Sequence, residues 1–303
     1  MKKRILSMIM VSILVLSFAA CQKTSEPASN DTSDTLTSAP DSTTKTPEST
    51  DDAQGSTDAA ADPSLQYILD KGEFILGLDD SFPPMGFTDD KGDIIGFDID
   101  LAKAVCEKLG VELKCQPIDW ETKEQELNTK NIDCIWNGLS VTPDRLENMT
   151  MSKPYLTNNI SLVVTSTSDI TSMADMAGKK LGIQGGSSAE EVLNDSANTA
   201  FRDSLAEVLP FEKYDTALMD METGNSDAVL MDTIVANYMI TSLGKSYKVL
   251  NETLLADAYA IGFRKGDQSL CDAVDNALTE LKAEGKIEEI ATKWFGGDIT
   301  TIE

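Results

Sequence analysis

Residues 134–145 read CIWNGLSVTPDR, and the expectations for the rest of the chain start from this stretch. Cys134 to Trp136 form a short apolar run after turn-forming residues, which predicts a buried strand. Thr142 followed by Pro143 predicts the start of a helix, because a hydroxyl caps the first turn and proline has no N–H to leave unpaired. The stretch therefore predicts a strand, a turn that contains Gly138, and a helix.

Arg145 falls in the first turn of that predicted helix. Its planar guanidinium suits a carboxylate, and the free N–H groups of a helix start would complete an anion site. The alternative is an exposed ion pair with Asp144 or Glu147, which is what most surface arginines form. This stretch alone leaves both possibilities open.

The amino-terminal residues resemble an export signal followed by a linker. Three basic residues precede an apolar run over 5–18, and two alanines then lead directly to Cys21. The run is too short to span a membrane, and its arrangement is that of a bacterial lipoprotein signal covering 1–20, with lipid attached to Cys21. Residues 21–62 are rich in Ser, Thr, Asp, Ala and Pro, so we expect a disordered tether.

The charge of the chain excludes whole classes of function. The sequence has 25 basic and 51 acidic residues, a net charge of −26, and removal of the signal takes away three basic residues and leaves −29. Such an acidic surface argues against nucleic acid binding and favours solubility at a membrane face.

The chain has no histidine, which excludes Ser-His-Asp or Cys-His nucleophiles and HExxH metal sites.

Beyond Cys21, the cysteines show no metal-ligand spacing, and we expect no metal and no cofactor. They are Cys106, Cys115, Cys134 and Cys271. Most fall in apolar patterns, so buried free thiols are the default, although a bridge between Cys106 and Cys115 stays open in an exported protein.

Predicted strands and helices alternate from residue 63 onward, which indicates an α/β fold with a mostly parallel sheet covered on both faces. The length suffices for two modest domains. In such sheets ligands bind beyond the carboxyl ends of the strands. The residues that follow such ends in the first part of the chain are Asp79, Phe82, Trp120, Asn137, Gly138, Ser140 and Arg145.

A second set of strand ends carries two further candidates. A predicted strand over 180–184 leads through Gly185 to Ser188 into a helix, which makes either a small anion cradle or an ordinary helix cap. A predicted strand over 228–231 is followed by Asp232, either a helix cap or a free carboxylate that suits an ammonium group.

Taken together, these motifs resemble the polar amino acid family of extracellular solute-binding proteins, the receptors of amino acid ABC importers. The resemblance covers nearly all of residues 63–297 and rests on seven blocks in the same order. The blocks are GLDDSFPP at 77–84, GFDIDL at 96–101, GLSVTPDR at 138–145, SKPY at 152–155, QGGSS at 184–188, DAVLMD at 227–232 and KWFG at 293–296.

The resemblance implies a two-lobed fold of the periplasmic-binding-protein type II class, with two crossover strands. The first lobe would comprise residues 63–162 and 258–303, and the second lobe residues 163–257. It also implies a monomeric, lipid-anchored receptor on the extracellular face of a bacterial membrane that delivers an amino acid to an ABC permease.

Carried over residue by residue, the resemblance assigns the α-carboxylate of the ligand to Arg145. Ser140 would assist from the same lobe, and Ser187 and Ser188 would assist from the other. Gln184 belongs to the same predicted set of ligand-binding residues.

The α-ammonium is assigned to Asp232 and to the carbonyl of Gly138. Phe82 and Trp120 would enclose the ligand side chain, and Asp79 would reach its tip.

Asn137 departs from the family pattern, because a small residue often stands at this position. Its amide suggests a hydrogen bond to a polar side chain, so the expected ligand is a polar or cystine-like amino acid.

Two other functions stay open at this point. The fold also hosts enzymes, so a dehydratase acting on a prephenate-like acid is an alternative. A general acid needs a shifted pKa, however, and the sequence offers no paired carboxylates at helical spacing near the predicted site. A sensory domain is the third alternative, although we expect no membrane-spanning or signalling segment after Glu303.

Overall fold

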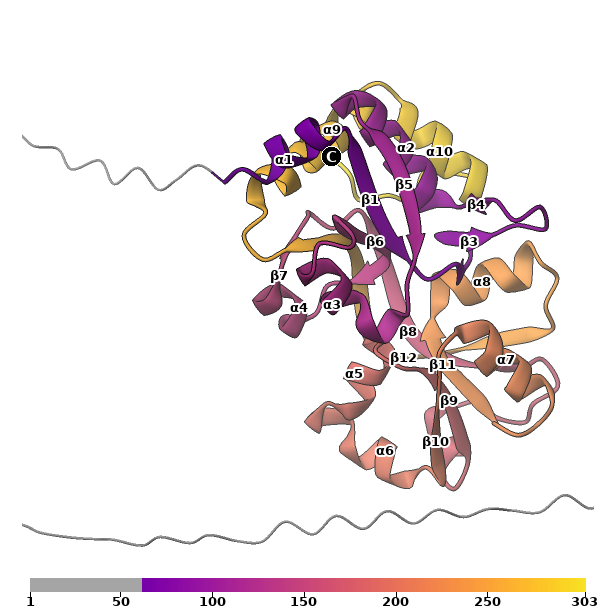
Figure 1. The fold of residues 1–303 in the computed structure, drawn as a ribbon. Helices are drawn as coiled ribbons and strands as arrows, with labels where there is room; N and C mark the ends of the chain where they lie inside the picture. Colours follow the sequence, from indigo (N-terminus) through magenta and orange to yellow (C-terminus); the bar gives the residue numbers. More distant parts are fainter. Residues whose placement is uncertain (1–61) are drawn as a thin grey trace, which may run out of the picture. The chain divides into compact units, whose positions relative to one another are not determined.

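The computed structural model describes residues 62–303, and helices and strands alternate throughout them (Figure 1). The predicted α/β fold with a mostly parallel sheet is confirmed. The expected signal over 1–20, the lipidated Cys21 and nearly all of the expected tether over 21–62 lie outside the described residues.

One large sheet organises the described chain, with strand order β10-β9-β11-β8-β12-β6-β1-β5 and with β7 paired to β12. Its strands are β1 Glu73–Leu78, β5 Glu112–Pro117, β6 Cys134–Ser140, β7 Met149–Met151, β8 Leu156–Thr165, β9 Lys180–Gln184, β10 Glu207–Phe211, β11 Ala228–Asp232 and β12 Tyr247–Arg264. A small separate sheet contains β2 Ser81–Phe82, β3 Gly86–Thr88 and β4 Ile94–Ile95.

Helices pack on both faces of the large sheet. They are α1 Ser64–Lys71, α2 Phe97–Leu109, α3 Lys123–Asn128, α4 Pro143–Asn148, α5 Ser188–Asn194, α6 Thr199–Ser204, α7 Tyr214–Glu222, α8 Thr233–Thr241, α9 Gln268–Ala283 and α10 Lys286–Phe295. Short 3-10 helices cover Trp120–Thr122, Met173–Met176 and Ser196–Asn198. In Figure 1, α2 lies beside β5 with α10 next to it, whereas α5 and α7 lie beside β9 and α6 lies next to α5.

Parallel pairing defines two halves of the large sheet. In the first sheet half β1 pairs with β5 and β6, and in the second sheet half β9 pairs with β10 and β11, all in parallel. The long strands β8 and β12 run antiparallel to each other and to their neighbours, and they connect the two halves. The carboxyl ends of β1, β6, β9 and β11 carry most of the residues that the sequence singled out.

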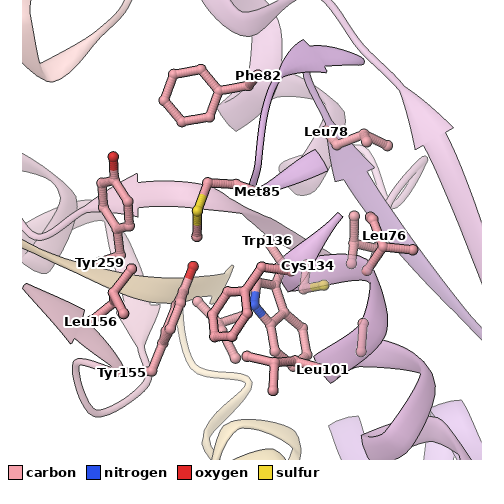
Figure 2. Packing of buried hydrophobic residues seen from close by; sticks show 14 of the residues in the cluster. Leu76, Leu78, Phe82, Met85, Leu101, Cys134, Trp136, Tyr155, Leu156 and Tyr259 are labelled. Carbon is pink, nitrogen blue, oxygen red and sulfur yellow. The ribbon is translucent and has the colours of Figure 1, made fainter. Parts of the chain in front are cut away.

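The hydrophobic core follows from this layering. β6 is buried at every position because helices cover it on both faces, as expected for a central parallel strand. Figure 2 shows part of the largest buried cluster, in which the ring of Tyr155 packs against those of Trp136 and Tyr259. Large aromatic side chains thus form part of this buried cluster.

The expected turn at Gly138 is wrong, because β6 continues through it to Ser140. Gly138 instead takes a left-handed backbone (φ +62°) inside the strand. Ile135 pairs with Gly262 and Leu139 with Ala260, so residues 136–138 on β6 oppose a single residue of β12. This bulge replaces the turn, and only glycine adopts its geometry without strain.

Two further observations concern the membrane and the thiols. Within residues 62–303 no helix combines the length and the apolar character needed to cross a bilayer. The cysteines at 106, 115, 134 and 271 are all free thiols; that of Cys115 is half-buried and the others are buried. A bridge between Cys106 and Cys115 is therefore not formed.

We expect Gly96 and Gly110, the glycines at the two ends of α2, to differ sharply in how far replacement by alanine destabilises the protein. A Cβ on Gly96 (φ +152°) would lie 2.1 Å from the Met85 carbonyl oxygen, whereas one on Gly110 (φ +72°) would meet nothing within 4 Å. Gly96→Ala should lower the free energy of unfolding by about 3 kcal/mol or more, and Gly110→Ala by about 1 kcal/mol. Urea denaturation followed by circular dichroism measures both, and equal losses would contradict the fold described around β3 and α2.

Candidate functional site

One cavity lies where the two sheet halves meet. It is lined by Asp79, Phe82, Trp120, Asn137, Gly138, Ser140, Arg145, Gln184, Ser187, Ser188, Tyr214 and Asp232. Every ligand-binding residue that the sequence predicted is in this set. The structure therefore brings together side chains that are up to about 150 positions apart in the chain.

The carboxyl ends of the strands explain the convergence. Asp79 directly follows β1, and residues 137–140 end β6. From the second sheet half, Gln184 ends β9 and Asp232 ends β11. Because parallel strands of both halves point toward the middle of the sheet, their ends border the same space.

Arg145 is almost fully buried, with 1% of its surface exposed. Its Nη1 donates to the Ser140 carbonyl at 3.0 Å, and its Nη2 donates to Glu191 Oε1 at 2.9 Å and to the Gly186 carbonyl at 3.5 Å. Within residues 62–303 its Nε has no hydrogen-bond partner. The exposed pair with Asp144 or Glu147 is not formed, and the guanidinium keeps N–H groups for a further acceptor.

Asp232 is the buried acid on the opposite side of the cavity. It occupies the N-cap position of α8, yet its side chain makes no capping hydrogen bond. Its Oδ1 accepts from Asn158 Nδ2 at 2.6 Å and from the Tyr259 hydroxyl at 2.7 Å. Burial raises the pKa of Asp232 to about 7, and the negative charge of Asp257 adds to this shift. A cation in the cavity would favour its ionised form.

Asp79 is a second buried carboxylate among the lining residues. Its Oδ1 accepts from the backbone and hydroxyl of Ser81, and its Oδ2 accepts from Gln184 Nε2 at 2.7 Å. Burial nevertheless raises its pKa, because desolvation outweighs these hydrogen bonds.

Several polar contacts cross the cavity region between the two sheet halves. The hydroxyls of Ser140 and Ser188 lie 2.8 Å apart, and Lys123 Nζ donates to the Gly186 carbonyl at 2.8 Å. At the rim, Lys213 Nζ pairs with Asp80 Oδ1 at 2.6 Å. Burial, with the neighbouring charge of Arg145, lowers the pKa of Lys123 to about 8.

The Gly185 to Ser188 segment is partly an ordinary helix cap. Ser187 is the N-cap of α5, and its hydroxyl accepts from the Glu190 N–H while donating to the Gln184 carbonyl. Ser188 instead directs its hydroxyl to Ser140. Both still border the cavity. The ordinary helix cap is formed, and the Gly186 N–H donates to Glu190 Oε2 at 2.7 Å, so the anion cradle stays a prediction.

Tyr214 is the lining residue that sequence reasoning missed. It is the first residue of α7, shortly after β10 ends, and its ring centroid lies 5.9 Å from that of Phe82. The same rule about strand ends identifies it once β10 is recognised as a strand. Glu191 and Lys123 were also missed, because only their contacts across the cavity connect them to the site.

The cavity thus presents one guanidinium, two carboxylates, aromatic rings and hydroxyls. Arg145 and Asp232 come from different sheet halves, and no ion pair joins them in the part of the chain that the structure describes. Opposite charges held apart in a buried space suit a small zwitterion. Residues 62–303 contain no cluster of His, Cys, Asp and Glu side chains that could hold a metal ion.

Comparison with characterised proteins finds relatives that are named for the amino acids they bind. The L-cystine-binding protein TcyJ of Escherichia coli (strain K12) is 27% identical over 238 residues, covering 78% of this chain and 87% of that protein. The histidine-binding periplasmic protein of Salmonella typhimurium is 28% identical over 232 residues, covering 74% and 88%.

Solved structures resemble the described fold over most of its length. An ABC uptake transporter substrate-binding protein from Streptococcus pneumoniae with bound histidine is 38% identical with a TM-score of 0.76, covering 80% of this chain and 99% of that chain. Tv2483 bound to L-arginine is 28% identical with a TM-score of 0.75, covering 80% and 98%. The model of the bacterial extracellular solute-binding proteins, family 3, matches residues 74–297. The chain belongs to this family.

Proposed function

We propose that this protein is the receptor of an amino acid importer, which binds a free amino acid in the cavity and delivers it to an ABC permease. The observation that carries the proposal is the placement of Arg145 and Asp232 in one cavity from opposite sheet halves. The α-carboxylate and α-ammonium of an amino acid have the matching charges. Relatives named for cystine and histidine binding support this assignment.

At the carboxylate end, the ligand would meet the free N–H groups of Arg145 and the hydroxyls of Ser140 and Ser188. Glu191 and the Ser140 carbonyl hold the guanidinium by its Nη atoms, while Nε keeps an unpaired N–H. A fixed guanidinium with an open N–H loses little freedom when it binds a carboxylate.

At the other end, Asp232 and the Gly138 carbonyl would take the ammonium. The side chain of the ligand would lie among Phe82, Trp120 and Tyr214, with Asn137, Asp79 and Gln184 as its polar neighbours. This mixture of aromatic and polar groups favours a polar or cystine-like amino acid over an aliphatic one.

Binding would be coupled to closure of two lobes, residues 63–162 with 258–303 and residues 163–257. The contacts between Ser140 and Ser188, Asp79 and Gln184, and Asp80 and Lys213 join the two sides. A ligand that bridges both sides stabilises the closed arrangement by its differential affinity. We further propose a monomer, tethered through lipid on Cys21 at the extracellular face of the membrane, without catalytic activity.

A thermal-shift screen with the protein amino acids and cystine tests the function directly. We expect a strong stabilisation by one ligand or a small related group, since a bound ligand raises the melting temperature by mass action. Recovery of that ligand unchanged after long incubation separates a receptor from an enzyme. No shift with any amino acid would refute the proposal.

Arg145→Ala should weaken binding of the ligand found in this screen by about 3 to 5 kcal/mol, because the buried carboxylate loses its partner. This corresponds to roughly a hundredfold to several thousandfold in Kd by isothermal titration calorimetry. Arg202→Ala, which removes an arginine paired with Asp203 on the surface, is the matched control and should bind as the wild type does. A loss of less than tenfold for Arg145→Ala would count against the assignment.

The affinity should fall as the pH is lowered through about 7, the raised pKa of Asp232. An ammonium group binds the ionised carboxylate, so below this pH a proton must first leave, and Kd should rise by up to about tenfold per pH unit. Asp232→Asn keeps an oxygen for Asn158 and Tyr259, and we expect it to bind weakly with little dependence on pH. Calorimetry from about pH 5 to 8 measures both, and a wild-type Kd that is constant over this range would contradict the role of Asp232.

Cys21→Ser should release the protein from cells into the medium, because the lipid anchor can no longer be attached. Ser25→Ala, a change in the same tether, should leave the protein on the cell. Fractionation and immunoblotting of cells and medium measure the distribution. Retention of the Cys21→Ser protein at the cell surface would contradict attachment through lipid on Cys21.

A further inference from the structure

Asp98 is a buried acid close to the cavity that the proposed binding mode does not use. It lies in the first turn of α2, within the GFDIDL block, and none of its surface is exposed. Among residues 62–303, no lysine or arginine nitrogen lies within ion-pair distance of its carboxylate. A buried carboxylate without a counter-charge is costly and calls for a reason.

Capping of its own helix does not supply that reason. Gly96 is the N-cap of α2, and no side-chain capping bond is formed there. Asp98 Oδ2 instead accepts from the Gly138 N–H at 2.8 Å and from the Tyr155 hydroxyl at 2.9 Å. Both donors lie outside α2, and one of them, Gly138, lines the cavity.

The bond to Gly138 replaces one that the sheet cannot provide. Residues 136–138 form the bulge of β6. Pairing with β1 ends at Ile135, and pairing with β12 resumes only at Leu139. The Gly138 N–H therefore needs another acceptor, and Asp98 is the one it has. Because the N–H and C=O of one peptide unit point in opposite directions, this bond also fixes where the Asn137 carbonyl points. Both Asn137 and Gly138 line the cavity.

The bond to Tyr155 extends the support to the other side of the site. The Tyr155 ring packs against the Tyr259 ring with centroids 6.5 Å apart, and Figure 2 shows the two rings as neighbours. The Tyr259 hydroxyl in turn donates to Asp232 Oδ1 at 2.7 Å. Asp98 thus contacts Gly138 directly, and it connects to Asp232 through the packed rings of Tyr155 and Tyr259.

We propose that Asp98 is a positioning residue of the binding site, which holds the Asn137–Gly138 peptide in its cavity-lining orientation and anchors Tyr155 beneath Tyr259. This inference rests on the proposed function, since the supported groups adjoin the Gly138 carbonyl and Asp232, which that proposal assigns to the ammonium of the ligand. The role depends on acceptance of hydrogen bonds, so an amide oxygen at this position can perform it.

The test compares Asp98→Ala, Asp98→Asn and Asp100→Asn by calorimetry with the amino acid identified in the thermal-shift screen. Asp100 is the matched control, a carboxylate two residues further along α2 that accepts from Lys293 and Trp294, away from the cavity. We expect Asp98→Ala to weaken binding by about tenfold to a hundredfold, and Asp98→Asn by less than about threefold. Asp100→Asn should bind as the wild type does.

A second measurement follows the amide of Gly138 by NMR in the wild type and in Asp98→Asn, which preserves the side-chain shape. Burial raises the pKa of Asp98 to about 7. In the wild type, the Gly138 amide resonance should therefore move with pH as Asp98 ionises, and in the variant this movement should be much smaller. An Asp98→Ala protein whose folded fraction binds with wild-type Kd, or a Gly138 amide that behaves identically in both proteins, overturns the inference. A wild type that binds no amino acid refutes the proposed function instead, so the two failures are distinguishable.

Discussion

The structure depends on keeping two opposite buried charges apart. Arg145 and Asp232 border the same cavity, yet each is held by neutral or charged partners of its own and not by the other. A buried charge is tolerated only when hydrogen bonds and counter-charges compensate for lost hydration. Here the compensation stops short of saturating either group, because Arg145 Nε has no partner among residues 62–303 and burial raises the pKa of Asp232. The free N–H of Arg145 and the carboxylate of Asp232 suit the two opposite charges of a zwitterion.

The topology of the sheet creates this separation. β8 and β12 run through the middle of one continuous sheet, and the parallel strands on either side end toward each other. Each half therefore contributes its strand ends to a shared space, Arg145 and Asp79 from one side and Asp232 and Gln184 from the other.

Around the cavity, irregular backbone is stabilised by buried side chains. The bulge at residues 136–138 removes N–H groups from the sheet, and Asp98 accepts the one from Gly138. A Cβ on Gly138 would lie 2.8 Å from the Phe82 ring, so glycine also permits the close approach of an aromatic wall. The left-handed glycine, the buried acid and the packed tyrosines form one connected support for the site.

The sequence by itself determined the local elements and most of the site, because apolar periodicity, helix caps and the rule about strand ends are all local signals. It led to Arg145 and Asp232 by this reasoning, with the family resemblance assigning their roles. Tertiary structure alone decided that Arg145 pairs with Glu191 and that Gly138 lies in a bulge and not a turn. These features depend on contacts between residues far apart in the chain, and the partner of a buried polar group is chosen only when packing brings distant elements into register.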